Sequence, residues 1–395
     1  EHGMLATLKH FPGNGGTMLD QHIAPAYIGA SRETMEAVYL KPYRELIQNV
    51  QPEVIMVAHL EVPSLCTEKH PQSGRVVPAS MSEEIITGLL KQKMRFDGMV
   101  ITDATNMGGV NNLYTREEAV VKTIQAGSDM ILDFYPEDFE RDYQALLDAV
   151  KSGSISEERL NDAVRRVLTA KYRAGLHADG GAPANEEDRE EIFTPGTFEP
   201  MLRDISQKGI TVLRNSKRML PLKNGVEGKS VALIEVHSPE KKVMADHGQS
   251  MPEYVFGSEL RERGADVTEY EIVSSMSMAD IRQVFDELRG FEVVFLNFYI
   301  VPSYGIGSLH PNLNATRLLY QGLLKQNEHL VITCFGDPYI TVQCIAAHTL
   351  ICALDESEIT QKTVLEAILG ETLVSGRMPV RLEGFFEYGD GEDLN

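Results

Sequence analysis

The sequence is poor in basic residues, and this limits the partners it can have. Its 395 residues include 37 Lys and Arg against 58 Asp and Glu, a formal net charge of −21. This balance argues against nucleic acid as a partner, because such binding depends on cationic side chains facing phosphates, and it equally disfavours an anionic membrane surface. The sequence also lacks any run of about 18 apolar residues, so it predicts no membrane-spanning helix.

Cysteine is scarce as well. The four cysteines have spacings that form no disulfide framework: Cys66, Cys334, Cys344 and Cys352. Because Cys334 and Cys352 stand in apolar, strand-like runs, we predict buried free thiols. The sequence also lacks a phosphate loop, a dinucleotide fingerprint and an internal repeat, and no cofactor is expected.

What is present is an alternation of short apolar runs with amphipathic segments. The apolar runs predict strands at about 5–10, 53–58, 98–102 and 129–133. Helical patterns lie at about 31–49, 81–94, 116–126, 137–151 and 156–173. Four β/α units in series have the rhythm of a (β/α)8 barrel and supply half of its strands.

A second α/β pattern follows the first. A linker rich in Gly, Ala, Pro and acidic residues is predicted at 177–200, between a partial (β/α)8 domain at 1–176 and an α/β sandwich domain at 201–395. The second domain is expected to begin with a helix near 199–208 and a strand-like run at 210–215. Further strands are predicted at about 230–236, 292–300, 329–335 and 349–354. Parallel strands with helices on both faces are the natural arrangement for this pattern.

The most informative stretch is residues 9–22, Lys-His-Phe-Pro-Gly-Asn-Gly-Gly-Thr-Met-Leu-Asp-Gln-His. It leads from a strand into a glycine-rich loop, which presents Asp20 and His22 two positions apart. In an extended segment these side chains point to the same side, so the carboxylate can hold the ring N–H and raise the proton affinity of the imidazole. The pair therefore predicts a general acid/base. Taken alone, it also fits a surface turn with a chance Asp and His.

Polar residues also stand at the carboxyl ends of the predicted strands, where a β/α barrel builds its active site. They are Lys9, His10, His59 and Asp103. Asp103 follows Met-Val-Ile-Thr and is the candidate nucleophile; capping of the following segment is the alternative role. His59 is expected to line the floor of the pocket, or to be a core histidine with satisfied hydrogen bonds.

Three ordered motifs carry a resemblance to a known family. They are Lys9–Gly13 followed by Gly15 and Asp20-x-His22, then Val77–Ser82, and then Phe96–Asp103. The sequence resembles glycoside hydrolase family 3, and more narrowly its β-N-acetylglucosaminidase branch. The resemblance implies Asp103 as nucleophile, Asp20 and His22 as an acid/base dyad on a mobile loop, and Lys9, His10, His59 and Asn14 as substrate-binding residues. It departs from the family at Asn14, which is usually His, and at Gln21, which is commonly Ser.

The resemblance implies a retaining hydrolase that removes a terminal β-linked N-acetylglucosamine, or a related β-hexoside, through a covalent glycosyl-aspartate. The expected partner is a small-molecule or oligosaccharide substrate, and phosphate in place of water as the acceptor stays open. One alternative is a barrel metallohydrolase with His10, His59 and Asp103 as ligands, although no His-x-His or His-x-x-x-His pattern supports it. Another is a degenerate family member that binds carbohydrate without turnover.

The resemblance also places the first strand about halfway round a barrel. We therefore expect that roughly 150–200 residues of barrel are missing from the front of the sequence. Four β/α units would leave both outer strands unpaired, so the 395 residues expressed alone should aggregate and show negligible glycosidase activity. Adding the upstream reading frame should restore both properties, and a soluble, monomeric, fully active product of these 395 residues would contradict this expectation. A leader or lipid anchor would be lost with the front half, so the location, cytoplasmic or secreted, stays open, as does the oligomeric state.

Overall fold

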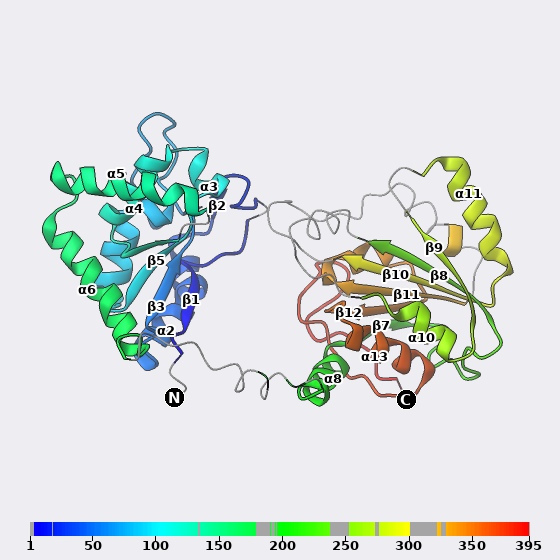
Figure 1. Cartoon of the computed structure of the whole chain (residues 1–395). Coiled ribbons are helices and arrows are strands. Elements are labelled where there is room, and N and C mark those ends of the chain that lie inside the picture. Colours follow the sequence, from blue (N-terminus) through cyan, green and yellow to red (C-terminus); the bar gives the residue numbers. More distant parts are fainter. Residues whose placement is uncertain are drawn as a thin grey trace. The chain divides into compact units, whose positions relative to one another are not determined.

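The computed structural model describes residues 4–17, 19–132, 135–178, 190, 194, 196–237, 253–272, 276–300, 322–324 and 329–394. These residues form two compact units, the first up to residue 178 and the second from residue 190 (Figure 1). Most of the predicted linker, 177–200, lies outside the described residues, so its boundaries stay a prediction. None of the helices in the described ranges is long and apolar enough to cross a bilayer.

The first unit is built on a parallel sheet of four strands. They are β1 (Thr7–Phe11), β3 (Val54–Val57), β5 (Met99–Ala104) and β6 (Met130–Leu132). Their order in the sheet, β1-β3-β5-β6, is their order in the chain, and each neighbouring pair is parallel. The arrangement confirms the predicted β/α rhythm, with half the strands of a (β/α)8 barrel.

Helices connect these strands close to the predicted positions. They are α1 (Arg32–Thr34), η1 (Met35–Tyr39), α2 (Lys41–Asn49), η2 (Ala79–Met81), η3 (Glu84–Lys93), α3 (Gly108–Asn111), α4 (Arg116–Ala126), η4 (Pro136–Asp138), α5 (Phe139–Lys151) and α6 (Glu157–Arg173). One core joins the sheet to these helices: Ile55 and Val100 contribute from β3 and β5, and Ile47, Leu89 and Ala119 from α2, η3 and α4. A short parallel pair, β2 (Ala26–Tyr27) with β4 (Leu60–Glu61), was not predicted.

The second unit contains a six-stranded sheet. Its strands are β7 (Thr211–Asn215), β8 (Ser230–His237), β9 (Asp266–Glu271), β10 (Val293–Ile300), β11 (Leu330–Gly336) and β12 (Thr349–Ala353), in the order β7-β12-β11-β10-β8-β9. Its helices are α8 (Glu199–Gly209), α10 (Phe256–Glu262), α11 (Met278–Glu287), η6 (Leu288–Gly290), η7 (Pro338–Cys344) and α13 (Glu358–Leu369). The predicted strands and the first helix are all present within a few residues.

Two features of this sheet differ from the expectation. The strand β7 pairs antiparallel with β12, whereas parallel strands were predicted throughout. The edge strand β9 was missed because its sequence, Asp-Val-Thr-Glu-Tyr-Glu, contains no apolar run and no alternation: Val267 and Tyr270 stand three positions apart. An edge strand needs no such run, since only one of its sides pairs with the sheet.

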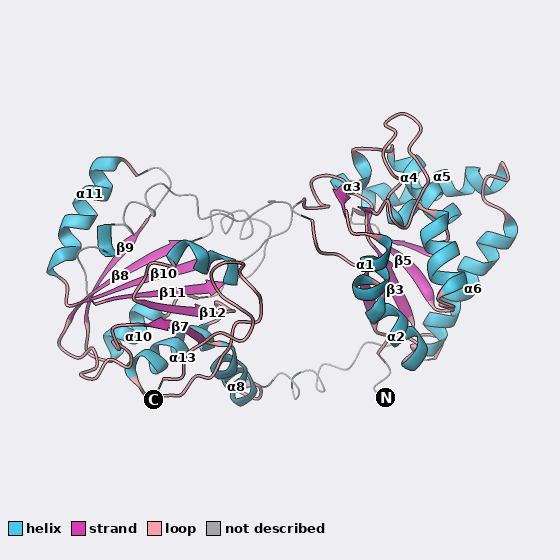
Figure 2. Cartoon of the chain, turned by 180° about the vertical axis from the view of Figure 1, so that it is seen from behind, coloured by secondary structure: helices cyan, strands magenta, loops and turns pink. Residues whose placement is uncertain are grey.

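Helices cover both faces of the six-stranded sheet (Figure 2). Successive residues of β10 point to opposite faces: Val294 belongs to a core shared with Ile281 of α11, and Phe295 to a core shared with Phe256 of α10 and Leu365 of α13. Every residue of β10 is buried, as expected for a central strand of a doubly covered parallel sheet. The predicted α/β sandwich is thereby confirmed.

The four cysteines are free and buried, as predicted. Cys66 belongs to the core of the first unit, and Cys334, Cys344 and Cys352 to one core of the second. Burial raises the pKa of the Cys66 thiol and raises the pKa of Cys352 to about 12. These thiols are therefore protonated at neutral pH.

A buried cluster of charges ties the amino-terminal ends of β5 and β6 to the helices outside them. Lys91 of η3 lies 2.8 Å from Asp129 Oδ1, and Arg159 of α6 pairs with the same carboxylate, whose side chain is fully buried. The other oxygen of Asp129 accepts a hydrogen bond of 2.9 Å from the Val100 amide. Burial lowers the pKa of Lys91 to about 8, against the opposing effect of Asp129. The ammonium therefore pays a desolvation cost that ion pairing only partly offsets.

This cost predicts a pH-dependent stability. An unfolded lysine titrates near pH 10.4 and folded Lys91 near pH 8, so between these values the unfolded chain binds more protons and the wild type becomes more stable as pH rises. Lys91→Met should lack this component, which amounts to at most roughly 1.4 kcal/mol per pH unit. Urea unfolding of both proteins, followed by circular dichroism from about pH 7 to about pH 10, measures the difference. A wild type that loses stability relative to Lys91→Met as pH rises would contradict it.

Candidate active site

Asp103 stands at the carboxyl end of β5, where the sequence predicts the nucleophile. It is 9% exposed, and its Oδ1 accepts a hydrogen bond of 2.9 Å from the Ala104 amide. His10, near the end of β1, places Nε2 3.6 Å from Asp103 Oδ2. The strand β3 separates β1 from β5 in the sheet. The structure therefore brings together two residues that are more than 90 positions apart in the sequence.

The two histidines nearest Asp103 differ in how they are held. Burial lowers the pKa of His10, although Asp103 raises it, so the ring is neutral near pH 7. His59 is completely buried; its Nδ1 lies 2.7 Å from Ser80 Oγ and its Nε2 3.0 Å from the Ala104 carbonyl oxygen. Because a carbonyl oxygen only accepts, Nε2 is the donor to Ala104, and a neutral ring then accepts the Ser80 hydroxyl at Nδ1. His59 thus fixes the backbone next to Asp103.

The predicted dyad is formed in the structure. His22 Nδ1 lies 2.6 Å from Asp20 Oδ1, and the His22 amide donates to the same oxygen at 2.9 Å. The carboxylate therefore holds both the ring and the backbone of its partner, as expected from the spacing. Since Nδ1 is bonded to Asp20, any proton exchanged with a substrate would be carried by Nε2.

The glycine-rich loop before the dyad rests on Tyr39. The Tyr39 hydroxyl donates to the Gly15 carbonyl oxygen at 3.3 Å. Gly13 and Gly16 have φ of 127° and 65°, and a Cβ on them would lie 2.8 Å from Tyr39 Cδ1 and 2.5 Å from the Tyr39 hydroxyl. Glycine is required at both positions by its backbone conformation and by this close contact.

The dyad loop is also bonded to the segment that follows β5. The amides of Gly108 and Gly109 donate to the carbonyl oxygens of His22 and Gln21 at 2.9 and 2.8 Å. A Cβ on Gly108 would lie 2.1 Å from the Ile23 carbonyl oxygen, so only glycine allows this approach. The Gln21 side chain continues the connection: its Nε2 donates to Asp103 Oδ2 at 3.2 Å.

A cavity of about 690 Å³ adjoins this cluster. Three of the predicted substrate-binding residues line it: Lys9, His10 and Asn14. Lys9 and Asn14 are exposed, so their polar ends are accessible. The fourth, His59, is not among the residues that line the cavity: it is buried with both ring nitrogens bonded, as in the alternative of a core histidine with satisfied hydrogen bonds.

The alternative metal site is not supported by this geometry. His59 has no ring nitrogen left to coordinate an ion, so the set His10, His59 and Asp103 presents fewer than three ligands. Among the residues that the structure describes, no group of three His, Cys, Asp or Glu side chains is placed to hold a metal ion.

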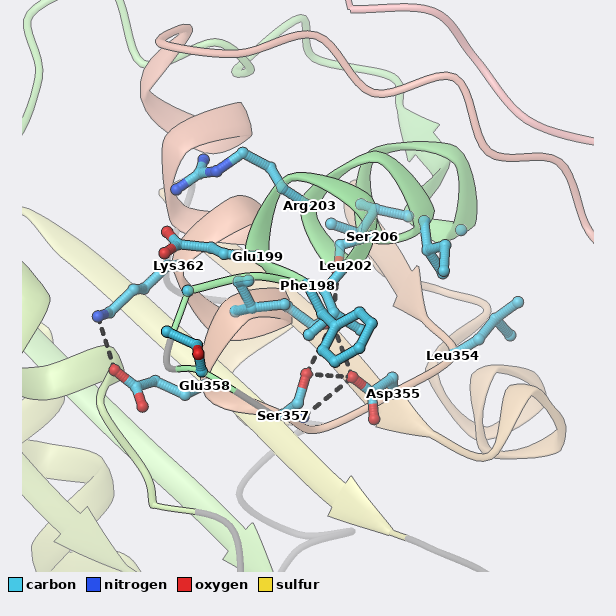
Figure 3. Close-up of a pocket in the computed structure, with 17 residues that line it drawn as sticks. Phe198, Glu199, Leu202, Arg203, Ser206, Leu354, Asp355, Ser357, Glu358 and Lys362 are labelled. Carbon is cyan, nitrogen blue, oxygen red and sulfur yellow. Dashed lines mark hydrogen bonds and ion pairs between the residues drawn. The ribbon is translucent and has the colours of Figure 1, made fainter. Parts of the chain in front are cut away.

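A second cavity, of about 980 Å³, lies in the second unit and contains none of the predicted site residues (Figure 3). Apolar side chains line it, including Phe198 directly before α8 and Leu202 within α8. At the start of α13, the Asp355 carboxylate accepts from the Ser357 hydroxyl and from Thr360 Oγ1, so these polar groups satisfy one another. This cavity has the character of an apolar groove, and its polar groups are already bonded.

Sequence reasoning missed four contributors to the active site. Gln21 entered only as a departure from a family motif, because the stretch from Asp20 to His22 was expected to be extended. In the structure residues 21–23 form a turn, with the Ile23 amide 3.0 Å from the Asp20 carbonyl oxygen. Ser80 lies inside a quoted motif with no assigned role. The pair Gly108 and Gly109, directly after the strand of Asp103, was a visible signal of a close backbone approach.

The chain is similar to known proteins over most of its length. Residues 1–170 match the model of the glycosyl hydrolase family 3 N terminal domain. A beta-N-acetylglucosaminidase/beta-glucosidase of Cellulomonas fimi is 25% identical over 388 residues, which is 96% of this chain and 66% of that protein.

Two solved structures are similar over most of the chain. A family 3 beta-N-acetylglucosaminidase from Paenibacillus sp. str. FPU-7 is 26% identical with a TM-score of 0.74, covering 94% of this chain and 66% of that one. A beta-glucoside phosphorylase is 25% identical with a TM-score of 0.80, covering 96% and 66%. The chain thus spans slightly less than two thirds of each relative. The family match over residues 1–170 includes Asp103, the dyad and the strands that carry them, and in this range the chain resembles the glycosyl hydrolase family 3 N terminal domain.

Proposed function

We propose that this chain carries the catalytic groups of a retaining β-glycosidase whose preferred substrate ends in β-linked N-acetylglucosamine. The observation that carries the proposal is the cluster at the end of β5. There Asp103 lies beside His10 and is hydrogen bonded to the loop that holds the Asp20–His22 pair. A carboxylate and a carboxylate-bound imidazole are the two groups that double displacement needs.

In the first step Asp103 attacks the anomeric carbon. The new C–O bond replaces the bond to the leaving group, and the leaving oxygen takes the proton of His22 Nε2. Asp20 holds the ring through Nδ1 and stabilises the imidazolium before it gives up its proton, which is the role of the third group in a triad. His10 and His59, neutral because burial lowers their pKa, leave the negative charge of Asp103 available for attack.

In the second step the neutral His22 takes a proton from water, whose oxygen bonds to the anomeric carbon and releases Asp103. Most glycosidases use a second carboxylic acid here. A histidine with an aspartate partner is suited to the same work, because an imidazole can both donate and accept a proton.

Phosphorolysis is the second candidate. The similarity to a beta-glucoside phosphorylase favours it, and a neutral histidine would repel a phosphate acceptor less than a carboxylate would. A panel of aryl β-glycosides (N-acetylglucosaminide, glucoside, xyloside) with and without phosphate separates the candidates. Free sugar indicates hydrolysis, sugar 1-phosphate indicates phosphorolysis, and binding without product indicates the degenerate family member.

Asp103→Asn should abolish turnover, with a loss of roughly 10⁴-fold or more in kcat. The substitution keeps the volume of the side chain and removes the nucleophilic oxygen, so circular dichroism should be unchanged. Asp97→Asn is the matched control, since Asp97 stands just before the same strand and its side chain is 85% exposed. A 2-deoxy-2-fluoro glycoside should label the wild type at Asp103, and peptide mapping identifies the site. A label on another carboxylate, with Asp103 unmodified, would sink the assignment.

His22→Ala should slow substrates with poor leaving groups far more than nitrophenyl glycosides, because a good leaving group needs little protonation. The differential should reach roughly 10²-fold or more, and Asp20→Asn should act in the same direction with a smaller effect. Measuring kcat/KM for an aryl series of graded leaving-group acidity, on this chain and on the product of its whole reading frame, gives the slope. Equal losses across the series would mean that His22 only contacts the sugar.

A further inference from the structure

Gln21 stands between the two members of the dyad and points away from them. Its side chain is bonded at both ends: Oε1 accepts from the His59 amide at 3.1 Å, and Nε2 donates to Asp103 Oδ2 at 3.2 Å. The residue is only 5% exposed. A backbone N–H can only donate and a carboxylate only accepts, so the orientation of the carboxamide is fixed by its partners.

These contacts connect three parts of the site. The backbone of Gln21 belongs to the dyad loop. Its side-chain oxygen bonds to His59, two residues after β3, and its side-chain nitrogen bonds to Asp103, the last residue but one of β5. Gly109 secures the backbone of Gln21 from the other side, with its amide 2.8 Å from the Gln21 carbonyl oxygen. A displacement of the dyad loop would therefore remove a donor from Asp103, and a displacement of Asp103 would pull on the loop.

We propose that Gln21 is a positioning residue that couples the dyad loop to the nucleophile, so that His22 and Asp103 are held as one unit. The proposal rests on the assignment of Asp103 and His22 given above. A shorter side chain, such as the serine expected at this position from the family motif, could not span both partners. The coupling is therefore a property of the glutamine in this chain.

The hydrogen bond from Gln21 also contacts a charged group of the site, the Asp103 carboxylate. Two titratable side chains that interact with Asp103 are His10 on β1 and His59 after β3, both neutral near pH 7 because burial lowers their pKa. Lys9 and His22 in turn act on His10. The amide of Gln21 is a neutral donor placed directly on one oxygen of this carboxylate, at 3.2 Å from Oδ2. A carboxylate that loses such a donor binds a proton more readily.

The test compares the wild type with Gln21→Met, which keeps length and removes both polar atoms, and with Gln21→Glu. The acidic limb of the pH profile of kcat/KM for a nitrophenyl glycoside should move to higher pH, by roughly half a unit to one unit in Gln21→Met. In Gln21→Glu it should move by more than about one unit, because two adjacent carboxylates do not readily ionise together. Gln125→Met is the matched control, since Gln125 bonds only to Ser154 in the described structure, and it should leave the profile in place.

A second measurement does not depend on turnover. In Gln21→Met, hydrogen–deuterium exchange should accelerate in the peptide spanning residues 104–112, because the amides of Gly108 and Gly109 lose a firmly held acceptor loop. Absence of turnover both in this chain and in the product of its whole reading frame refutes the proposed function, and the exchange rates then decide the coupling alone. An unshifted acidic limb, or unchanged exchange where the wild type shows no turnover, overturns the coupling. A uniform loss of activity at every pH would likewise assign Gln21 a purely structural role.

Discussion

The active site depends on a close approach of two backbone segments. At Gly108 and Gly109 the chain after β5 lies so near residues 21–23 that a Cβ on Gly109 would stand 3.0 Å from both the Gln21 carbonyl oxygen and His59 Cβ. Two backbone hydrogen bonds hold the segments together there. These bonds fix the dyad loop against the strand end that presents Asp103. The Gln21 side chain then connects the loop to Asp103 itself.

The ends of the strands in the first unit have different roles. At the carboxyl ends, polar groups lie beside a cavity and are held by short hydrogen bonds to backbone atoms. At the amino ends, Asp129 joins Lys91 and Arg159 in a buried cluster that connects the sheet to η3 and α6. Stability and chemistry are thus separated along the same strands, which is the division expected of β/α barrels.

The sequence was sufficient to predict the regular elements because their signal is local. Apolar runs such as that of β10 and amphipathic helices such as α6 keep their period whatever packs against them. Asp103 and the dyad were predicted as site residues for the same reason, since each stands at a position defined by a strand or by spacing. The edge strand β9 and the antiparallel direction of β7 depend on tertiary pairing, which leaves little periodic trace. The role of Gln21 was hidden because it depends on residues 38 and 82 positions away.

The distribution of cysteines has a practical consequence. Cys66 lies in the core of the first unit and the remaining three thiols lie in the second, all of them shielded and unpaired. A thiol-specific reagent reaches such groups only when the surrounding core opens. Mass spectrometry of the modified peptides would therefore report separately on the opening of each unit, from the natural sequence and without an added probe. Modification of Cys66 would report on the first unit, and modification of Cys334, Cys344 or Cys352 would report on the second.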